Sequence, residues 1–183
     1  MSINHLRKSH MEIGEVYFWT ATIVFWKKLF EPDNFKDKLI NSLRYLIEKK
    51  FIVVYGFVIM PNHIHIIWEM LKLNGKEMPS ISFLKFTAHQ FKKDLEIINP
   101  KILDIFKSDK NDREFQFWQR DALAVRIFSR EMLEQKLDYT HNNPLQEKWN
   151  LCSQPEDYFW SSAKFYNCEI DDFNFLTHYL DRF

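Results

Sequence analysis

The sequence contains little glycine, proline or cysteine, and its charges cancel. Only 3 Gly and 6 Pro occur among 183 residues, which excludes collagen-like and low-complexity structure. The 25 basic and 25 acidic side chains give no net charge, so a surface that binds nucleic acid would have to be a local patch. Two cysteines, Cys152 and Cys168, without zinc-ligand spacing predict no disulfide framework and favour a reducing, cytoplasmic environment.

Long apolar runs are also missing. No stretch is long enough to span a membrane, and residues 1–16, MSINHLRKSHMEIGEV, lack the apolar core of a signal peptide. We therefore expect no membrane partner. In contrast, 46% of the residues are hydrophobic and 17% are aromatic, which is enough for a substantial core. We expect one domain over residues 1–183, with a core at about 15–150 and a C-terminal extension, 151–183, packed on it.

The spacing of apolar residues predicts an α+β protein. Asp33 and Ser129 are suitable N-caps for the first and last helix, and Pro144 is expected to end the last one. The order strand, helix, strand, strand, helix, strand is the split β-α-β pattern of a ferredoxin-like fold, which predicts an antiparallel sheet with helices on one face. Strands are expected at 15–25, 51–60, 63–70 and 123–128, and helices at 32–50, 80–98 and 129–143.

The segment MPNHIHIIWEM, residues 60–70, places two histidines within an apolar strand. Because side chains alternate across a strand, His63 and His65 share one face, while Ile64 and Trp68 belong to the opposite, core-facing side. Two adjacent imidazoles suit a divalent metal, although catalysis also needs a third ligand and open coordination positions. The alternative is that both histidines simply lie on the solvent face of the sheet.

A second unusual segment is LDYTHNNPLQEKW, residues 137–149. Tyr139 and Asn143 are four residues apart, so on a helix they stand one turn from each other on one face. A tyrosine hydroxyl can act as a covalent nucleophile, and an amide oxygen is a suitable ligand for Mg²⁺ or Mn²⁺. Alternatively, Tyr139 is a core residue and Asn143 only ends the helix. His141 and Asn142 lie on other helical faces.

Several motifs together resemble one protein family. PNHIHIIW, residues 61–68, resembles the His-hydrophobic-His motif of the single-tyrosine HUH transposases. LDYTHNNPL, residues 137–145, resembles the Asp-Tyr-x-x-x-Asn-Pro motif of the REP-associated tyrosine transposase branch of that family. The neighbouring blocks YGFVIM (55–60), FWQRD (117–121) and PEDYFWSS (155–162) are also similar, so that the resemblance runs from about residue 15 to 166.

The resemblance implies the ferredoxin-like fold, with the two histidines on a central strand and the tyrosine on a C-terminal catalytic helix. His63 and His65 would then ligate Mg²⁺ or Mn²⁺, Tyr139 would be the nucleophile, and Asn143 a third ligand or a positioning group. The implied enzyme cleaves and rejoins single-stranded DNA at sites flanked by hairpins or inverted repeats, through a 5′-phosphotyrosine, either as a monomer or as a homodimer. Because the metal requires neutral histidines, activity is expected to fall below about pH 6.5.

A DNA strand-transfer enzyme also has to hold its DNA. A basic stripe on the helix of residues 80–98 lies opposite the apolar face and could follow a phosphate backbone, although such a stripe is also typical of a solvated helix surface. The stripe consists of Lys85, His89, Lys92 and Lys93, and Arg120 and Arg126 are further candidates for phosphate contacts.

Two other functions remain open on the sequence. The chain could be a DNA-binding module that keeps the fold without catalysis. It could also be a small metal-dependent hydrolase that uses His63, His65 and Glu69, which share one strand face. A hydrolase of that kind would keep its metal-dependent turnover in a Tyr139→Phe variant.

Overall fold

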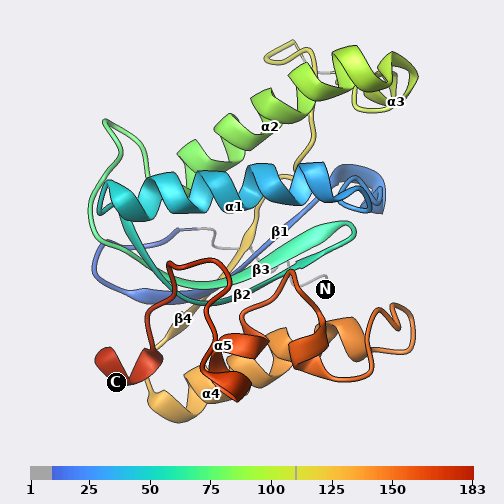
Figure 1. Cartoon of the computed structure of the whole chain (residues 1–183). Coiled ribbons are helices and arrows are strands. Elements are labelled where there is room, and N and C mark those ends of the chain that lie inside the picture. Colours follow the sequence, from blue (N-terminus) through green and yellow to red (C-terminus); the bar gives the residue numbers. More distant parts are fainter. Residues whose placement is uncertain (1–9, 110) are drawn as a thin grey trace, which may run out of the picture.

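The chain forms a four-stranded antiparallel sheet between two layers of helices (Figure 1). The computed structural model describes residues 10–109 and 111–183. Most of residues 1–16, which the sequence predicts not to be a signal peptide, lies outside these ranges. No helix within these described ranges is long and apolar enough to cross a membrane. The strands are β1 (Val16–Thr22), β2 (Ile52–Met60), β3 (His63–Met70) and β4 (Leu123–Ile127), and they lie side by side in the order β2-β3-β1-β4.

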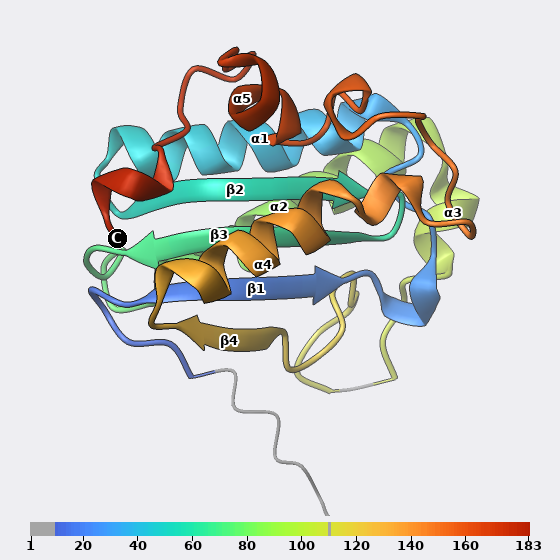
Figure 2. The same cartoon turned by 90° about the horizontal axis from the view of Figure 1, so that it is seen from below.

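Helices cover both faces of this sheet. The first two helices lie together on one face, whereas the fourth crosses the other face diagonally and packs on β2 and β3 (Figures 1 and 2). The antiparallel sheet and the α+β class agree with the ferredoxin-like prediction. The expected placement of helices on one face holds for the first two, whereas the helix after β4 covers the other face. The helices are α1 (Asp33–Glu48), α2 (Pro79–Ile98), α3 (Pro100–Asp104), α4 (Arg130–His141) and α5 (Ala163–Cys168).

The alternation of side chains divides the core into two clusters, one on each face of the sheet. Toward α1 and α2, Trp19 of β1 packs on Trp68 of β3 with ring centroids 4.8 Å apart, and Phe83 of α2 covers both rings. Toward α4, Phe18 and Ile67 pack under the apolar side of that helix. The prediction that Trp68 faces the core is confirmed, and the histidine face is the one beneath α4.

Two local predictions are wrong. β1 ends at Thr22 rather than near residue 25, because Phe25 and Trp26 adopt φ values of 56° and 55° that no strand can accommodate. Asp33 is the first helical residue rather than the N-cap, and its carboxylate accepts hydrogen bonds from the side chains of Lys36 and Trp160. Ser129 does cap α4, since its hydroxyl accepts a hydrogen bond from the Met132 backbone N–H.

The C-terminal residues run along the free edge of β2. Ser161 forms an isolated bridge with Val58, and the Thr177 backbone N–H donates to the Val54 carbonyl over 3.0 Å. Phe173 packs on Phe57 with ring centroids 5.1 Å apart. These contacts cover backbone groups that an edge strand would otherwise present to other chains.

Candidate active site

The two histidines lie on β3, between β2 and β1. His65 is paired with Thr20 of β1 and His63 with Thr22, so all four side chains point to the same face of the sheet. Both imidazoles are buried, and their ring centroids are 4.7 Å apart. The turn of Pro61 and Asn62 joins β2 directly to β3, which holds His63 at the start of its strand.

Hydrogen bonds orient both rings through Nδ1. Asn62 uses its Nδ2 to donate to the Trp26 carbonyl, which leaves its Oδ1 to accept from His63 Nδ1 over 2.7 Å. His65 Nδ1 lies 2.7 Å from the Thr20 hydroxyl. In the described part of the chain neither Nε2 has a hydrogen-bond partner. This is the arrangement of metal-binding histidines, in which one ring nitrogen is held so that the other can ligate.

Burial keeps both imidazoles neutral. It lowers the pKa of His63 to about 4, with a further contribution from the positive charge of Lys148. Burial also holds the pKa of His65 well below its usual value, helped by His63 and by the ammonium groups of Lys148 and Lys136. With these lowered pKa values the histidines become protonated only at a lower pH, so the predicted loss of activity is expected below, rather than near, pH 6.5.

Tyr139 approaches this pair from α4. Its ring stands edge-on to His65 at 5.3 Å and to Phe18 at 5.8 Å, measured between ring centroids. Tyr139 is 47% exposed, so a substrate can approach it from solvent. The alternative that Tyr139 is a core residue is therefore wrong. The same helix turns Leu133 and Leu137 into the core, as their spacing from Tyr139 requires.

The close approach of α4 to the sheet depends on Gly56 in β2. The register of β2 against β3 shifts between Val54 and Gly56, which marks a bulge. A Cβ added at Gly56 would overlap Leu137 Cδ2 and lie 3.3 Å from the hydroxyl of Ser162. Glycine at this position thus lets the helix that carries the tyrosine pack directly on the strand.

Asn143 lies just after α4, at the start of a 3-10 turn, Asn143–Leu145, that contacts β2. The side chain is only 2% exposed, and its Oδ1 is buried without a hydrogen-bond partner. A buried carbonyl oxygen without a donor is costly, and a cation that it ligates would offset that cost. The chemistry of these three side chains suits a divalent metal: His63 and His65 offer neutral imidazoles with unpaired Nε2 atoms, and Asn143 offers an amide oxygen that lacks a donor.

Two lysines near this site were not identified from the sequence. Lys136 lies one turn before Tyr139 on α4, with its ammonium 5.1 Å from the centre of the Phe18 ring. Lys148 lies 5.5 Å from the ring of Trp149, which itself faces His63. Both ammonium groups are near enough to lower the pKa of His65. In the sequence, the three-residue spacing of Lys136 from Tyr139 indicates that both lie on one side of the helix, whereas no pattern places Lys148 near the site.

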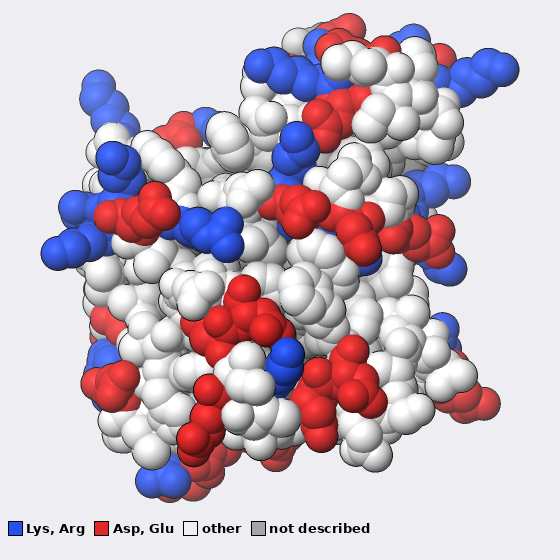
Figure 3. Space-filling model, viewed as in Figure 1, with Lys and Arg blue, Asp and Glu red and all other residues white. Residues whose placement is uncertain are grey.

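The predicted DNA-binding stripe lies elsewhere. Lys85, His89, Lys92 and Lys93 are on α2, which covers the opposite face of the sheet from the two histidines (Figure 1). Lys85 is paired with Glu77, and Lys92 with Glu114 at 2.9 Å. On the face shown in Figure 3, basic side chains near α1 and α2 alternate with acidic ones. A role of this stripe in holding DNA stays a prediction.

The two predicted arginines lie near β4. Arg126 forms ion pairs with Glu15, at 2.5 Å, and with Glu12. Arg120 lies before β4, 3.6 Å from Asp112, and remains about half exposed. Arg120 lies near Thr20 and Thr22, at the end of the sheet that carries the histidines. Arg126 lies at the other end, opposite Tyr17 near the start of β1.

Glu69 does not join the histidines. It lies at the other end of β3, where its Oε2 accepts hydrogen bonds from the Tyr55 hydroxyl over 2.9 Å and from Arg182 Nε over 3.1 Å. Among the residues that the structure describes, no three His, Cys, Asp or Glu side chains come together as a metal site. The geometry therefore does not support a hydrolase built on His63, His65 and Glu69.

Fold and site together define a class: a ferredoxin-like α+β protein with paired histidines on a central strand and a tyrosine on a following helix. A solved structure of a REP-associated tyrosine transposase bound to a REP hairpin has this fold. The two structures superimpose with a TM-score of 0.60, over 92% of this chain and 88% of that chain, at 16% sequence identity. No family model and no curated protein matches the sequence.

Proposed function

We propose that this protein is a metal-dependent tyrosine transposase that cleaves and rejoins single-stranded DNA at sites flanked by hairpins. The observation that carries this proposal is the position of the exposed Tyr139 against His65, whose Nε2 is unpaired. The buried Oδ1 of Asn143, which follows the tyrosine helix and has no donor, supports it. The similar solved structure is a transposase bound to a DNA hairpin, which supports hairpin DNA as the substrate.

Mg²⁺ or Mn²⁺ would be held by His63, His65 and Asn143, and would polarise a phosphoryl oxygen of the substrate. These residues need no proton release to bind it at neutral pH, since burial already keeps both histidines neutral. Lys136 and Lys148 add positive charge where a DNA phosphate would lie against Tyr139. Charge placed in advance around the reacting phosphate is the main way in which proteins accelerate phosphoryl transfer.

The reaction exchanges one phosphodiester for another. The Tyr139 Oη forms a bond to phosphorus, and the bond from phosphorus to the 3′-oxygen breaks. The phenolic proton is lost to solvent, and the departing 3′-oxygen takes up a proton to become a 3′-OH. The 5′ end remains on the protein as a phosphotyrosine. A later attack by a DNA 3′-OH reverses these steps and releases Tyr139, so rejoining requires no nucleotide cofactor.

The test is the covalent intermediate itself. Wild-type protein incubated with Mn²⁺ and 5′-labelled or 3′-labelled hairpin DNA with single-stranded flanks should form a denaturation-resistant adduct that carries only the 3′-side fragment. Tyr139→Phe removes the attacking oxygen and should abolish the adduct, whereas Tyr45→Phe, an exposed tyrosine on α1, should not.

Two outcomes would contradict the proposal. An adduct that persists in Tyr139→Phe would assign the nucleophile to another residue. If no adduct formed with a library of hairpins while the protein still bound them, the chain would instead be a DNA-binding module with this fold.

A further inference from the structure

A hollow of about 330 Å³ adjoins the histidine pair at the end of β1. Its walls include Thr20 and Thr22 from β1, Trp26 from the turn that follows, and the segment before β4 that contains Gln119, Arg120 and Asp121. We call it the Trp26 hollow. Its volume is within the range of small-molecule sites.

The Trp26 hollow shares Thr20 with the candidate active site. Thr20 lines the hollow and also contacts His65 Nδ1, and Thr22 lies directly opposite His63. The Trp26 carbonyl accepts a hydrogen bond from Asn62 Nδ2 over 3.1 Å, and the other end of the same amide holds His63. A group bound in the hollow would therefore be adjacent to a phosphate held at the histidines.

Trp26, which lines the hollow, and the preceding Phe25 are exposed aromatic residues in a costly backbone conformation. Trp26 is 64% exposed and Phe25 70%, and both have the left-handed φ values that bulky residues rarely adopt. Asp121, which also lines the hollow, has a positive φ as well, 59°. Strained backbone and exposed aromatic rings that contribute little to the core are typical of ligand-binding positions.

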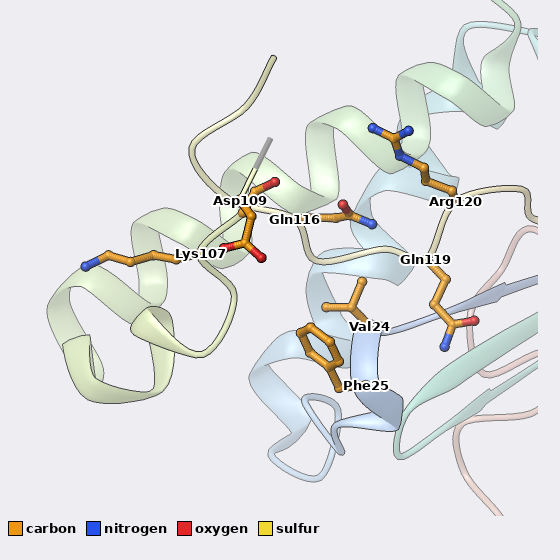
Figure 4. Close-up of a pocket in the computed structure, with 8 residues that line it drawn as sticks. Val24, Phe25, Lys107, Asp109, Gln116, Gln119 and Arg120 are labelled. Atoms are coloured by element: carbon orange, nitrogen blue, oxygen red, sulfur yellow. The ribbon is translucent and has the colours of Figure 1, made fainter. Parts of the chain in front are cut away.

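The polar groups of the hollow are suited to a nucleobase. The Asp121 carboxylate has no partner among the described residues and can only accept hydrogen bonds, as from the amino group of a base. The Trp26 indole offers a face on which a base can stack. The side chains of Gln119 and Arg120 point in opposite directions (Figure 4). Both also line a second hollow, of about 370 Å³, together with Phe25 and Lys107.

We infer that the Trp26 hollow binds the unpaired nucleotide next to the phosphate that Tyr139 attacks, with its base stacked on Trp26 and its amino group hydrogen-bonded to Asp121. This inference rests on the proposed function for the location of the phosphate. It adds that the protein itself selects the base at the cut site, favouring bases with an amino group over thymine. The second hollow gives the strand a path away from the site.

The experiment measures binding without chemistry. Fluorescently labelled oligo-dC and oligo-dT are titrated with the protein in the presence of a chelator, and their anisotropy is recorded. The variants are Trp26→Ala, Trp26→Phe and Asp121→Ala. The matched control is Phe128→Ala, because Phe128 is 76% exposed but follows β4 at the opposite end of the sheet. Thermal unfolding of each variant checks that the fold is kept.

Wild type should bind oligo-dC more tightly than oligo-dT. Trp26→Ala should weaken binding of both by about tenfold, whereas Trp26→Phe and Phe128→Ala should bind nearly as wild type does. Asp121→Ala should remove the preference for oligo-dC. The inference is overturned if wild type binds neither oligonucleotide, if it binds both equally, or if Trp26→Ala binds like wild type.

Failure of this inference is distinguishable from failure of the proposed function. If a Tyr139-dependent adduct forms while Trp26→Ala binds normally, the enzyme assignment holds and the hollow has no such role. If no adduct forms but binding depends on Trp26 and Asp121, the hollow binds a nucleotide in a protein that does not cut DNA.

Discussion

At the residue scale, hydrogen bonds at one ring nitrogen of each histidine leave the other nitrogen available to bind a ligand. Asn62 holds His63, and Thr20 holds His65, each through Nδ1. Near the end of α4, Asn143 Oδ1 is a buried amide oxygen that has no donor among the described residues. Its role as a ligand can be separated from its position in the turn.

Asn143→Ala should weaken Mn²⁺ binding by about tenfold or more, because it removes one of three proposed ligands. Isothermal titration calorimetry with Mn²⁺ measures this directly. The matched control is Asn142→Ala, since the neighbouring Asn142 is exposed and its amide donates only to the Asp138 carbonyl. Equal Mn²⁺ affinity in wild type and Asn143→Ala would show that Asn143 is not a ligand.

At the element scale, the site exists because α4 packs closely on β2 and β3. Gly56 provides the space for Leu137, and the hydroxyl of Ser162 links the helix to the strand, since it lies 2.8 Å from His141 Nε2 and accepts from the Phe57 N–H over 2.9 Å. The position of Tyr139 thus depends on residues that never contact substrate.

Gly56→Ala should destabilise the protein by about 1–3 kcal/mol and reduce formation of the tyrosine adduct, because the added methyl group displaces Leu137 and the helix with it. Urea unfolding and the adduct assay measure the two effects. Leu137→Ala in the same chain restores the space, so the double variant should lose less stability than the sum of the single changes. Strict additivity would show that Gly56 and Leu137 do not compete for this space.

At the scale of the whole molecule, one chain contains both the histidines and the tyrosine, so a second copy is not needed to complete the site. Burial of neutral histidines on β3 and at the end of α4 also makes the fold sensitive to acid. The pKa of His63 and of His141 is lowered to about 4, whereas in the unfolded chain both would lie near 6.5.

Between those two pH values the unfolded chain binds more protons than the folded one, so the free energy of unfolding of the metal-free protein should fall as the pH falls from about 6.5 to 4. Each such histidine contributes a slope of up to about 1.4 kcal/mol per pH unit. His141→Gln should reduce the slope in urea unfolding with a chelator present, and the exposed His89→Gln should not. An unchanged slope in His141→Gln would show that His141 does not carry this effect.

The sequence by itself determined the order of the elements, the face that His63 and His65 share, and the turn that separates Tyr139 from Asn143. Each of these follows from local periodicity, which neighbouring residues along the chain define. Only the tertiary structure decided which helix lies over the histidines. Periodicity shows that α2 and α4 each have an apolar side but not which face of the sheet it covers, so the basic stripe on α2 could not be placed relative to the site. Lys148 and Trp26 reach the site through turns that carry no periodic signal.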